Sequence, residues 1–381
     1  MMNRNSLAML IPLFLASSSI DAKEIYNKNG QKINFYGEIN PLYFYYYSYK
    51  PFSFHSLGNY TNLRIGFYNQ TYINKYVSGY MHIEYHPKFS SEFNEGLANS
   101  FNKNNISLSY VGLDFGKWGS IDYGRNYGII HYSKKFTNKF FDNTENIMFH
   151  RDDNFLLGRT DDVVTYTNKD VLGYLKGFNL ILQHHNYCRN LESRITKKYN
   201  DSWGAALHYK NNCGFQIIGT TEINPYDENH NFNKKKYDWI KSYGVGCCYS
   251  FNRSIISGFY CHTRNIEHNF TRYHTQYKNL DGIEVAGRYD FNNGMHASVG
   301  YVKNFGKEII NGDYNKYSKN KILNHHFNFI LTYNFGTNFI FNVHYKCSLL
   351  KNDNENSVPI KLENYFDNIS NSIGTGMTYT F

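Results

Sequence analysis

The chain has 381 residues, a length that at roughly 100–200 residues per domain fits two or three ordinary domains or one large barrel. Aromatic residues make up 18% of it and hydrophobic residues 41%, yet the mean hydropathy is −0.59 and the formal charge is +9, because polar and basic residues dilute the apolar ones. After residue 22 no apolar run approaches the roughly 18 residues of a membrane-spanning helix, which excludes helical membrane proteins, and the aromatic content excludes a disordered chain.

Residues 1–22 have the layout of a cleaved secretory signal peptide. Arg4 supplies a positive region, residues 7–15 are apolar, and small polar residues lead to Ala22. The apolar segment is too short to cross a bilayer, and we expect cleavage after Ala22. A basic chain often binds nucleic acid, but an exported chain seldom meets any, so we expect no nucleic-acid partner.

Most of the remaining chain alternates apolar and polar side chains with a period of two, which is typical of β-strands. The segment Leu63-Arg64-Ile65-Gly66-Phe67 and the last residues up to Phe381 are examples. Short turns rich in Asn and Gly join several of these segments, and both residue types accept the positive φ that tight hairpins need. The clearest of these turns are Asn252-Arg253, 292–294 and 336–338.

Sixteen strands are predicted in this way. Their ranges are 33–47, 61–70, 76–86, 105–115, 119–125, 159–168, 177–187, 201–210, 214–223, 240–251, 254–264, 279–291, 295–305, 324–336, 339–350 and 366–381. The gaps after odd-numbered strands have 13 to 33 residues, whereas those after even-numbered strands have 2 to 8. One end of the structure therefore has all the long loops and the other all the tight turns.

This asymmetry predicts an all-β fold, a 16-stranded antiparallel transmembrane β-barrel with short periplasmic turns and long outer loops. In hydrocarbon every backbone N–H and C=O must be paired, so a spanning sheet has to close on itself. One row of side chains then faces lipid and the other the lumen, which explains a negative mean hydropathy beside many aromatic residues. A secreted β-sandwich or adhesin would also alternate but would not need strict long and short loops.

The cysteines and acidic pairs do not predict a metal site, a cofactor or an enzyme. No CxxC motif occurs, and the six cysteines are interpreted as isolated small hydrophobic residues, although an exported chain can oxidise some of them. The neighbouring pairs His184-His185 and His325-His326 put their rings on opposite faces of a strand, and no Gly-rich phosphate loop or nucleophile elbow is present. Asp152-Asp153 and Asp161-Asp162 are interpreted as solvated charges rather than Ca²⁺ ligands.

Several segments resemble the general, non-specific diffusion porins of Gram-negative outer membranes, the trimeric OmpF/OmpC-like family, and the resemblance covers the whole mature chain. The most specific one is Ser120-Ile121-Asp122-Tyr123-Gly124-Arg125-Asn126-Tyr127-Gly128. The others are 24–30 with Phe35-Tyr36-Gly37, Arg64-Ile65-Gly66-Phe67, Thr165-Tyr166-Thr167-Asn168, and the ending 376–381.

The resemblance implies that the third outer loop, residues 126–158, folds into the lumen as a constriction. By alignment with the family, Arg64 and Arg159 occupy positions of a cationic wall and Asp142 that of an acid on the loop, and Glu145 is expected to be a second acid of the constriction. Strand parity also places Arg64 and Arg159 in the lumen, since an arginine facing lipid at mid-depth would cost about 2–4 kcal/mol. The parity argument puts Asp161 in the same row as Arg159.

The chain departs from the family at several of these positions. Another wall arginine aligns with Ser107, a wall lysine aligns with Glu38, and one loop acid aligns with Asn138. The Pro-Glu-Phe-Gly-Gly-Asp tip of the family's loop is missing. These changes predict a weaker transverse field with a different shape.

We expect a porin that allows passive diffusion of ions and small hydrophilic solutes across the cell outer membrane. The expected pore lining comprises Glu38, Tyr36, Tyr127, Glu84, Ser107 and Asp161, whereas Arg125 is expected to be structural, bonding loop carbonyls or carboxylates near the rim. The expected partners are two further copies in a homotrimer, outer-membrane lipid and lipopolysaccharide, and the outer-membrane assembly machinery, for which Phe381 in the last strand is the signal. A non-conducting structural or adhesive barrel and a sugar-selective porin remain alternatives.

Overall fold

A computed structural model describes most of the chain after residue 22. The described residues are 23–47, 59–90, 105–138, 140, 155–186, 198–199, 201–227, 237–268, 275–311, 320–349 and 371–381. The predicted signal peptide and the loop acids Asp142 and Glu145 lie outside them.

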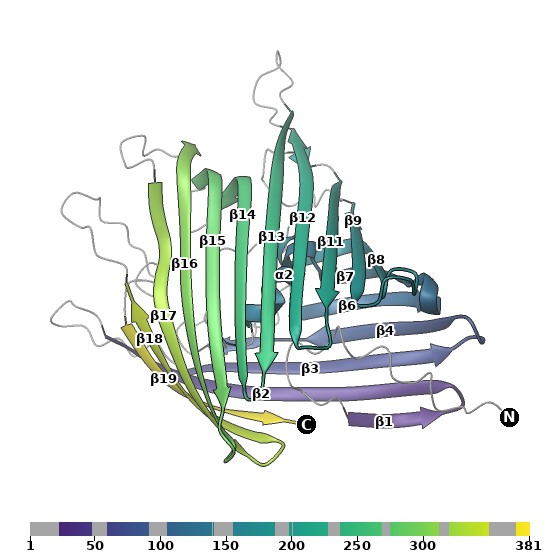
Figure 1. The fold of residues 1–381 in the computed structure, drawn as a ribbon, viewed down its shortest axis with the longest axis horizontal. Coiled ribbons are helices and arrows are strands. Elements are labelled where there is room, and N and C mark those ends of the chain that lie inside the picture. The colour runs from purple at the N-terminus through teal and green to yellow at the C-terminus, as the bar shows by residue number, and fades with distance from the viewer. Residues whose placement is uncertain are drawn as a thin grey trace.

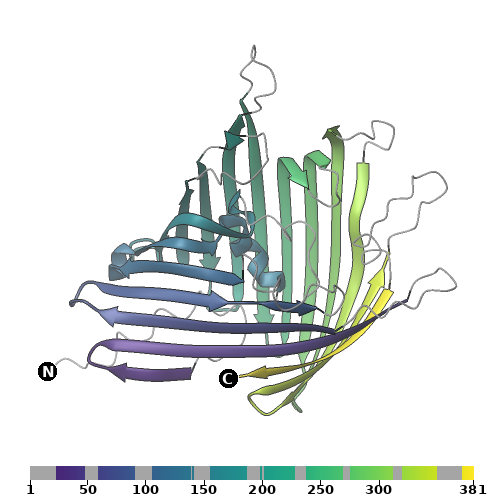
Figure 2. The same cartoon turned by 180° about the vertical axis from the view of Figure 1, so that it is seen from behind.

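Sixteen long strands in the described residues form one closed antiparallel sheet, which confirms the predicted barrel (Figures 1 and 2). They are β2 (Gln31–Tyr47), β3 (Asn59–Tyr72), β4 (Ser78–Tyr85), β6 (Ile106–Asp114), β7 (Ser120–Tyr127), β8 (Arg159–Asn168), β9 (Phe178–His185), β11 (Ser202–Lys210), β12 (Phe215–Asp227), β13 (Tyr237–Phe251), β14 (Ser254–His268), β15 (Thr275–Asp290), β16 (Met295–Asn311), β17 (Asn320–Phe335), β18 (Phe339–Ser348) and β19 (Asn371–Thr380). Each pairs with the next, and β19 pairs with β2.

Three short strands add to this barrel. β1 (Lys23–Lys28), which the alternation did not predict, forms a hairpin with β2. β5 (Lys88–Ser90) pairs with β3, and β10 (Lys198–Tyr199) pairs with β12. The predicted tight turns are confirmed, because Asn252, Gly294 and Gly336 have φ of 49°, 81° and 78° between paired strands.

The seam between the first and last long strands is closed at Phe381. Gly37 and Phe381 exchange two backbone hydrogen bonds of 2.9 and 3.0 Å. The Phe381 ring lies 5.6 Å from that of Phe35 and covers Gly37, where an ideal Cβ would stand 2.1 Å from the ring. Glycine at position 37 therefore lets this ring lie flat against the seam.

The outer face of the barrel is apolar and the inner face is mostly polar. On β11, Trp203 and Leu207 are exposed on the outside, whereas Ser202 and His208 are buried on the inside. Pairs of aromatic rings lie at the short-turn ends of the outer face, as the interfacial girdles of membrane barrels do. These pairs are Tyr249 with Phe251, Tyr289 with Phe291, and Tyr333 with Phe335. Among the described residues, no helix is long and apolar enough to cross a membrane.

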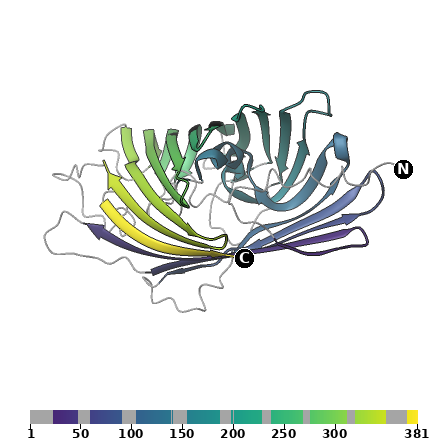
Figure 3. The same ribbon diagram turned by 60° about the horizontal axis from the view of Figure 1, so that its bottom comes forward.

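The segment predicted as the inserted loop contains a helix, α2 (Ile129–Asn138), and a 3-10 helix, η3 (Phe155–Leu157). Figure 3 shows α2 in the space that the strands surround. α2 follows β7 but packs against β12 to β15, so it crosses the interior. Its apolar residues join a buried cluster on an inner wall that strict alternation predicts to be polar. The cluster comprises Ile129, Ile130, Leu156, Leu157, Val163, Ile181, Ala206, Ile218, Ile240, Phe259, Cys261 and Leu280.

Glycines on the wall leave room for α2. Ideal Cβ atoms at Gly244 and Gly246 on β13 would stand 2.5 Å from Ser133 Oγ and 2.1 Å from the Ser133 backbone oxygen. Two polar contacts accompany this close approach. Ser133 Oγ lies 3.1 Å from Thr220 Oγ1, and Thr137 donates a hydrogen bond to the buried carboxylate of Glu284. The helix is therefore held against one side of the barrel.

The described cysteines lie in different settings and do not pair with one another. Cys213, Cys247, Cys248, Cys261 and Cys347 are free thiols, and Cys188 lies outside the described residues. Cys248 and Cys261 are buried, the second within the apolar cluster beneath α2.

Replacing Gly246 with Ala tests whether α2 is held against this wall. The new Cβ would meet a backbone oxygen, which no side-chain rotation relieves, so α2 would have to move into the lumen. Overpacking of this kind costs about 1–3 kcal/mol. We expect Gly246→Ala to change the single-channel conductance in planar bilayers and to raise the noise of the open state.

Gly219→Ala is the matched control. Gly219 lies on the neighbouring strand β12, and an ideal Cβ there meets no heavy atom within 4 Å. We expect this variant to conduct as the wild type does. If Gly246→Ala gave the same traces as Gly219→Ala, the contact between α2 and β13 would not shape the pore.

Candidate pore constriction

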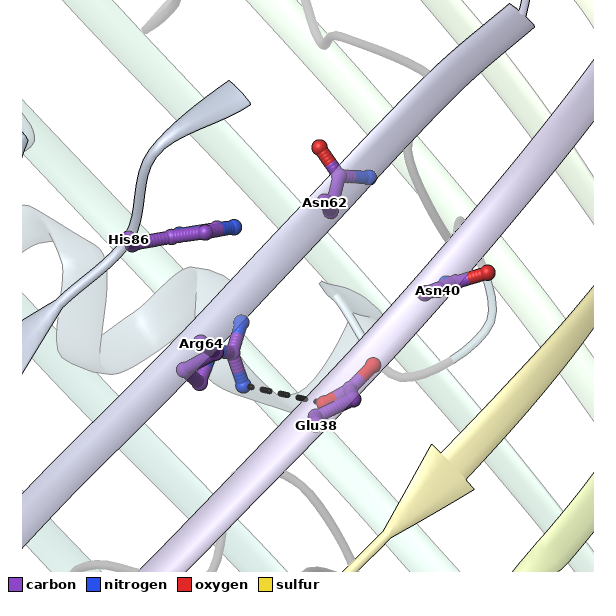
Figure 4. Close-up of a pocket in the computed structure, with 5 residues that line it drawn as sticks. All are labelled: Glu38, Asn40, Asn62, Arg64 and His86. Atoms are coloured by element: carbon purple, nitrogen blue, oxygen red, sulfur yellow. Dashed lines mark ion pairs between the residues drawn. The ribbon is translucent and has the colours of Figure 1, made fainter. Parts of the chain in front are cut away.

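Arg64 lies between two glutamates on the inner wall. Glu38 on β2 stands opposite Arg64 on β3 in the strand register, and Glu84 comes from β4 on the other side. The Arg64 guanidinium nitrogens lie 3.8 Å from a Glu38 oxygen and 3.9 Å from a Glu84 oxygen. Figure 4 shows Arg64 and Glu38 turned toward each other across the two strands.

Alternation along the strands turns these three side chains inward. Ile83 is 42% exposed on the outer face, whereas its neighbour Glu84 is 5% exposed. Ile39 is likewise exposed beside Glu38, and Phe67 shares the outer face with Ile65 of β3. A charged side chain at mid-depth on the outer face would lie in lipid, so the alternation along each strand places Glu38, Arg64 and Glu84 in the lumen.

A hydrogen-bond network holds Glu84 in place. The Tyr36 hydroxyl donates to Glu84 Oε2 over 2.8 Å and lies 2.8 Å from His82 Nε2. His82 Nδ1 in turn lies 3.2 Å from the hydroxyl of Tyr110. Of the four residues in this network, only Tyr36 and Glu84 were predicted from the sequence to line the pore. His82 and Tyr110 also occupy inward-facing positions of their strands, and this shared orientation would have indicated that the four residues lie together.

Further tyrosines pack beside this network, toward the short-turn end. Tyr80 donates a hydrogen bond of 3.1 Å to Asp122, and the Tyr80 ring lies 6.5 Å from Tyr68 and 6.4 Å from Tyr110. These rings contact one another and buried polar groups. They therefore form part of the wall structure.

Arg159 is linked to the inserted helix. Its guanidinium carbon lies 5.7 Å from the centre of the Tyr127 ring, and that ring stacks on His131 of α2 with centroids 4.2 Å apart and planes 8° from parallel. Burial, with Arg159, Lys134 and Lys135 nearby, lowers the pKa of His131 well below its usual range. A neutral imidazole is the form that stacks beside these cations. Sequence reasoning did not identify His131.

A β-bulge separates Asp161 from the regular part of β8. The register shifts between Gly124 and Asn126, and Asp162 has φ of 53°. Asp161 is 63% exposed and pairs with Arg125 at 3.0 Å. Arg125 also donates a hydrogen bond of 2.7 Å to the backbone oxygen of Ile106, as expected of a structural arginine. A bulge inserts an extra residue and so interrupts the alternation of inward and outward side chains. The sequence pattern therefore does not tell which face of the strand Asp161 is on.

The remaining predicted residues lie in different settings. Ser107 is buried in β6 beside a shift in register, and Asn138 is the last residue of α2. Asp142 and Glu145 lie outside the described residues, so the distance from the loop acids to the wall is not defined. The described geometry therefore brings together Tyr36, Glu38, Arg64 and Glu84. Tyr127 lies within electrostatic reach of Arg64 and Glu84 and also contacts Arg159.

This arrangement is suited to the passage of solutes. Its charged groups stand at mid-height on a strand wall, where they can orient ions and polar solutes that pass. Among the described residues, no group of three or more metal-binding side chains comes together.

Comparison with known proteins agrees with this geometry. The family model described as Gram-negative porin matches residues 28–381. A porin-like protein of Buchnera aphidicola subsp. Acyrthosiphon pisum is 31% identical over 395 residues, covering all of both chains. Outer membrane porin F of Escherichia coli strain K12 is 29% identical over 316 residues, covering 81% of this chain and 84% of that porin.

Solved structures show the same fold. A Salmonella typhi OmpF structure, described as a complex with daunomycin, superposes with a TM-score of 0.78 at 24% identity and covers 94% of this chain and 100% of that one. The family match over nearly the whole chain, with full-length relatives about 30% identical and a closed sixteen-stranded barrel, shows that this chain belongs to the Gram-negative porins of the outer membrane.

Proposed function

We propose that this porin forms a water-filled channel for passive diffusion of ions and small hydrophilic solutes. The observation that carries the proposal is a closed barrel whose inner wall bears charged residues at the height where α2 enters the lumen. A polar, charged wall favours solutes that keep their water, whereas an apolar solute gains nothing there. Conduction of this kind needs only weak contacts, because a tight site would hold the solute.

We propose that Arg64 and Arg159 form the cationic part of the constriction and that Asp142 and Glu145 supply the acids of the loop. Glu38, Tyr36, Tyr127, Glu84, Ser107 and Asp161 complete the proposed lining. The ring contact between Arg159 and Tyr127, and the stacking of Tyr127 on His131, support a wall and a helix that act as one unit.

The inward tyrosines do not favour a sugar-selective pore. Aromatic rings that bind sugars must present a free face, whereas Tyr68, Tyr80 and Tyr110 contact one another and His82. General diffusion is therefore the better-supported function.

The proposed assembly is a homotrimer in the outer membrane, as in the family that the chain resembles. Outward basic residues at the long-loop ends of the strands support contact with phosphate-bearing lipid, including lipopolysaccharide. Examples are Lys241, Arg264 and Lys307, which share the outer face with the exposed apolar residues. We propose that β19, with Phe381 at the seam, is the segment that the assembly machinery recognises.

Recording from purified protein in planar bilayers tests the pore directly. We expect ohmic steps that close in thirds, because three equal channels act in one trimer. Silence in protein that has the circular dichroism of a folded barrel would support a plugged, structural barrel instead. Block by maltodextrins at low concentration would support the sugar pore.

The double variant Arg64→Ala with Arg159→Ala tests the constriction. Removing two cations from the wall leaves its acids unopposed, so we expect the reversal potential in a salt gradient to shift toward cation preference. Lys32→Ala with Lys75→Ala serves as the control, because these lysines lie at the short-turn end, where Lys32 pairs with Glu24 and Lys75 lies over the Tyr76 ring. An unchanged reversal potential in the arginine variant would place these side chains away from the narrowest point.

A further inference from the structure

We propose that three short turns on one side of the barrel form a binding surface for anionic phospholipid of the periplasmic leaflet, in which lysines contact the phosphate and aromatic rings lie among the headgroups. These rim turns are residues 73–77 after β3, 115–119 after β6 and 169–177 after β8. The surface lies outside the barrel, so the inference does not depend on the proposed pore function.

Large side chains project from the rim turns. Tyr76, Trp118 and Tyr174 are 70%, 60% and 81% exposed. Further apolar residues are exposed beside them, namely Ile73, Phe115, Leu172 and Leu175. Only Asn, Gly, Thr, Cys and Arg make up the tips of the other four short turns, which are 211–214, 252–253, 292–294 and 336–338. The apolar tips therefore lie on one side of the periplasmic rim.

The rim turns and the strands that carry them lie close enough to form one surface. An ideal Cβ at Gly173 would stand 3.9 Å from Lys117 Cβ, which joins the second turn to the third. An ideal Cβ at Gly79 would stand 3.6 Å from Ile73 and 4.0 Å from Leu113, which joins the first turn to β6. A ligand larger than one side chain can therefore contact more than one turn.

The third rim turn holds its exposed side chains on a strained backbone. Asp170, Val171 and Leu172 have φ of 53°, 29° and 62°, a region that non-glycine residues and above all β-branched ones avoid. Asp170 Oδ1 accepts a hydrogen bond of 2.7 Å from the backbone N–H of Gly177, which fixes the turn. Strain of this kind concentrates at sites that bind ligands. The conformation leaves Tyr174 almost fully exposed.

The lysines of the rim turns are available to an anion. Lys75 Nζ lies 4.7 Å from the centre of the Tyr76 ring, and Lys117 Nζ lies 5.2 Å from that of Trp118. Neither lysine, nor Lys176, forms an ion pair with a described residue. Residues 73–77, 114–119 and 169–177 together hold four lysines and two aspartates, a net charge of +2.

The aspartates of this surface are used within it. Asp114 Oδ1 accepts a hydrogen bond of 2.8 Å from the backbone N–H of Gly116, as Asp170 does from Gly177. Lys169 lies within electrostatic reach of both carboxylates. The charge left for a partner is therefore positive, which selects an anionic one.

Continuity with the outer face of the barrel selects phospholipid as that partner. The exposed apolar row on β6 runs through Val111 and Leu113 to Phe115, and Trp118 follows it. Tryptophan and tyrosine are enriched at the level of the headgroups, where lysine side chains reach the phosphates. A soluble anion would meet the lysines but leave the rings in water. An anionic phospholipid meets both.

Trp118 can report the contact, because the chain has only three tryptophans. In the Trp203→Phe, Trp239→Phe background all tryptophan emission comes from Trp118. We expect phosphatidylglycerol that is brominated near the headgroup end of its acyl chains to quench this emission more strongly than brominated phosphatidylcholine does. The relative binding constant of the two lipids should favour phosphatidylglycerol on the order of fivefold at low salt. Replacing Lys75, Lys117 and Lys176 with Gln should bring it close to one.

The matched control replaces three outward lysines at the long-loop half of the barrel with Gln, and these are Lys241, Lys303 and Lys307. The same charge is then lost far from Trp118, so the relative binding constant should stay at the wild-type value. Circular dichroism verifies the barrel in each variant. Equal quenching by the two brominated lipids, or a ratio that the rim lysines do not change, would overturn the inference. Quenching of Trp118 by aqueous iodide but not by brominated lipid would overturn it too, because the surface would then face the periplasm and a protein.

Discussion

The need to pair every backbone N–H and C=O inside hydrocarbon controls the rest of this structure. A flat sheet would leave two unpaired edges, so β19 returns to β2, and the seam is completed by the bonds between Gly37 and Phe381. Closure creates an inside and an outside, and the pleat of each strand then assigns neighbouring residues to opposite faces. The exposed Ile83 and the buried Glu84 are one example of this assignment. The pore is thus a consequence of closure and alternation together.

Closure alone would leave a wide channel, and α2 changes its shape. The helix displaces water from one inner wall, where Ile218, Ile240 and Phe259 are apolar although they face inward. Burial of this patch supplies the free energy that keeps the helix in place, and Gly244 and Gly246 allow its backbone to approach. The opposite wall keeps Arg64 and its two glutamates. One side of the lumen is therefore dry and packed, and the other is charged.

The charged side shows how one residue alters a pore without altering its fold. Glu38 stands where the resembled family has a lysine, and the register places it directly opposite Arg64. A lysine there would add to the arginine's charge, whereas the glutamate opposes it. Because this position faces the lumen, either side chain would keep its charge away from lipid.

Local patterns in the sequence determined the strands, their order and the two unlike ends of the barrel, because alternation and turn residues act over a few positions. The predicted strand 159–168 coincides with Arg159–Asn168, and the turn at Asn252 lies where it was expected. Local patterns could not reveal α2, whose docking depends on wall glycines more than 100 residues later in the chain. Nor could they follow Asp161 across a bulge, or show that Glu38 and Glu84 both approach Arg64. Those features arise only when distant segments meet, and so the tertiary structure decided them.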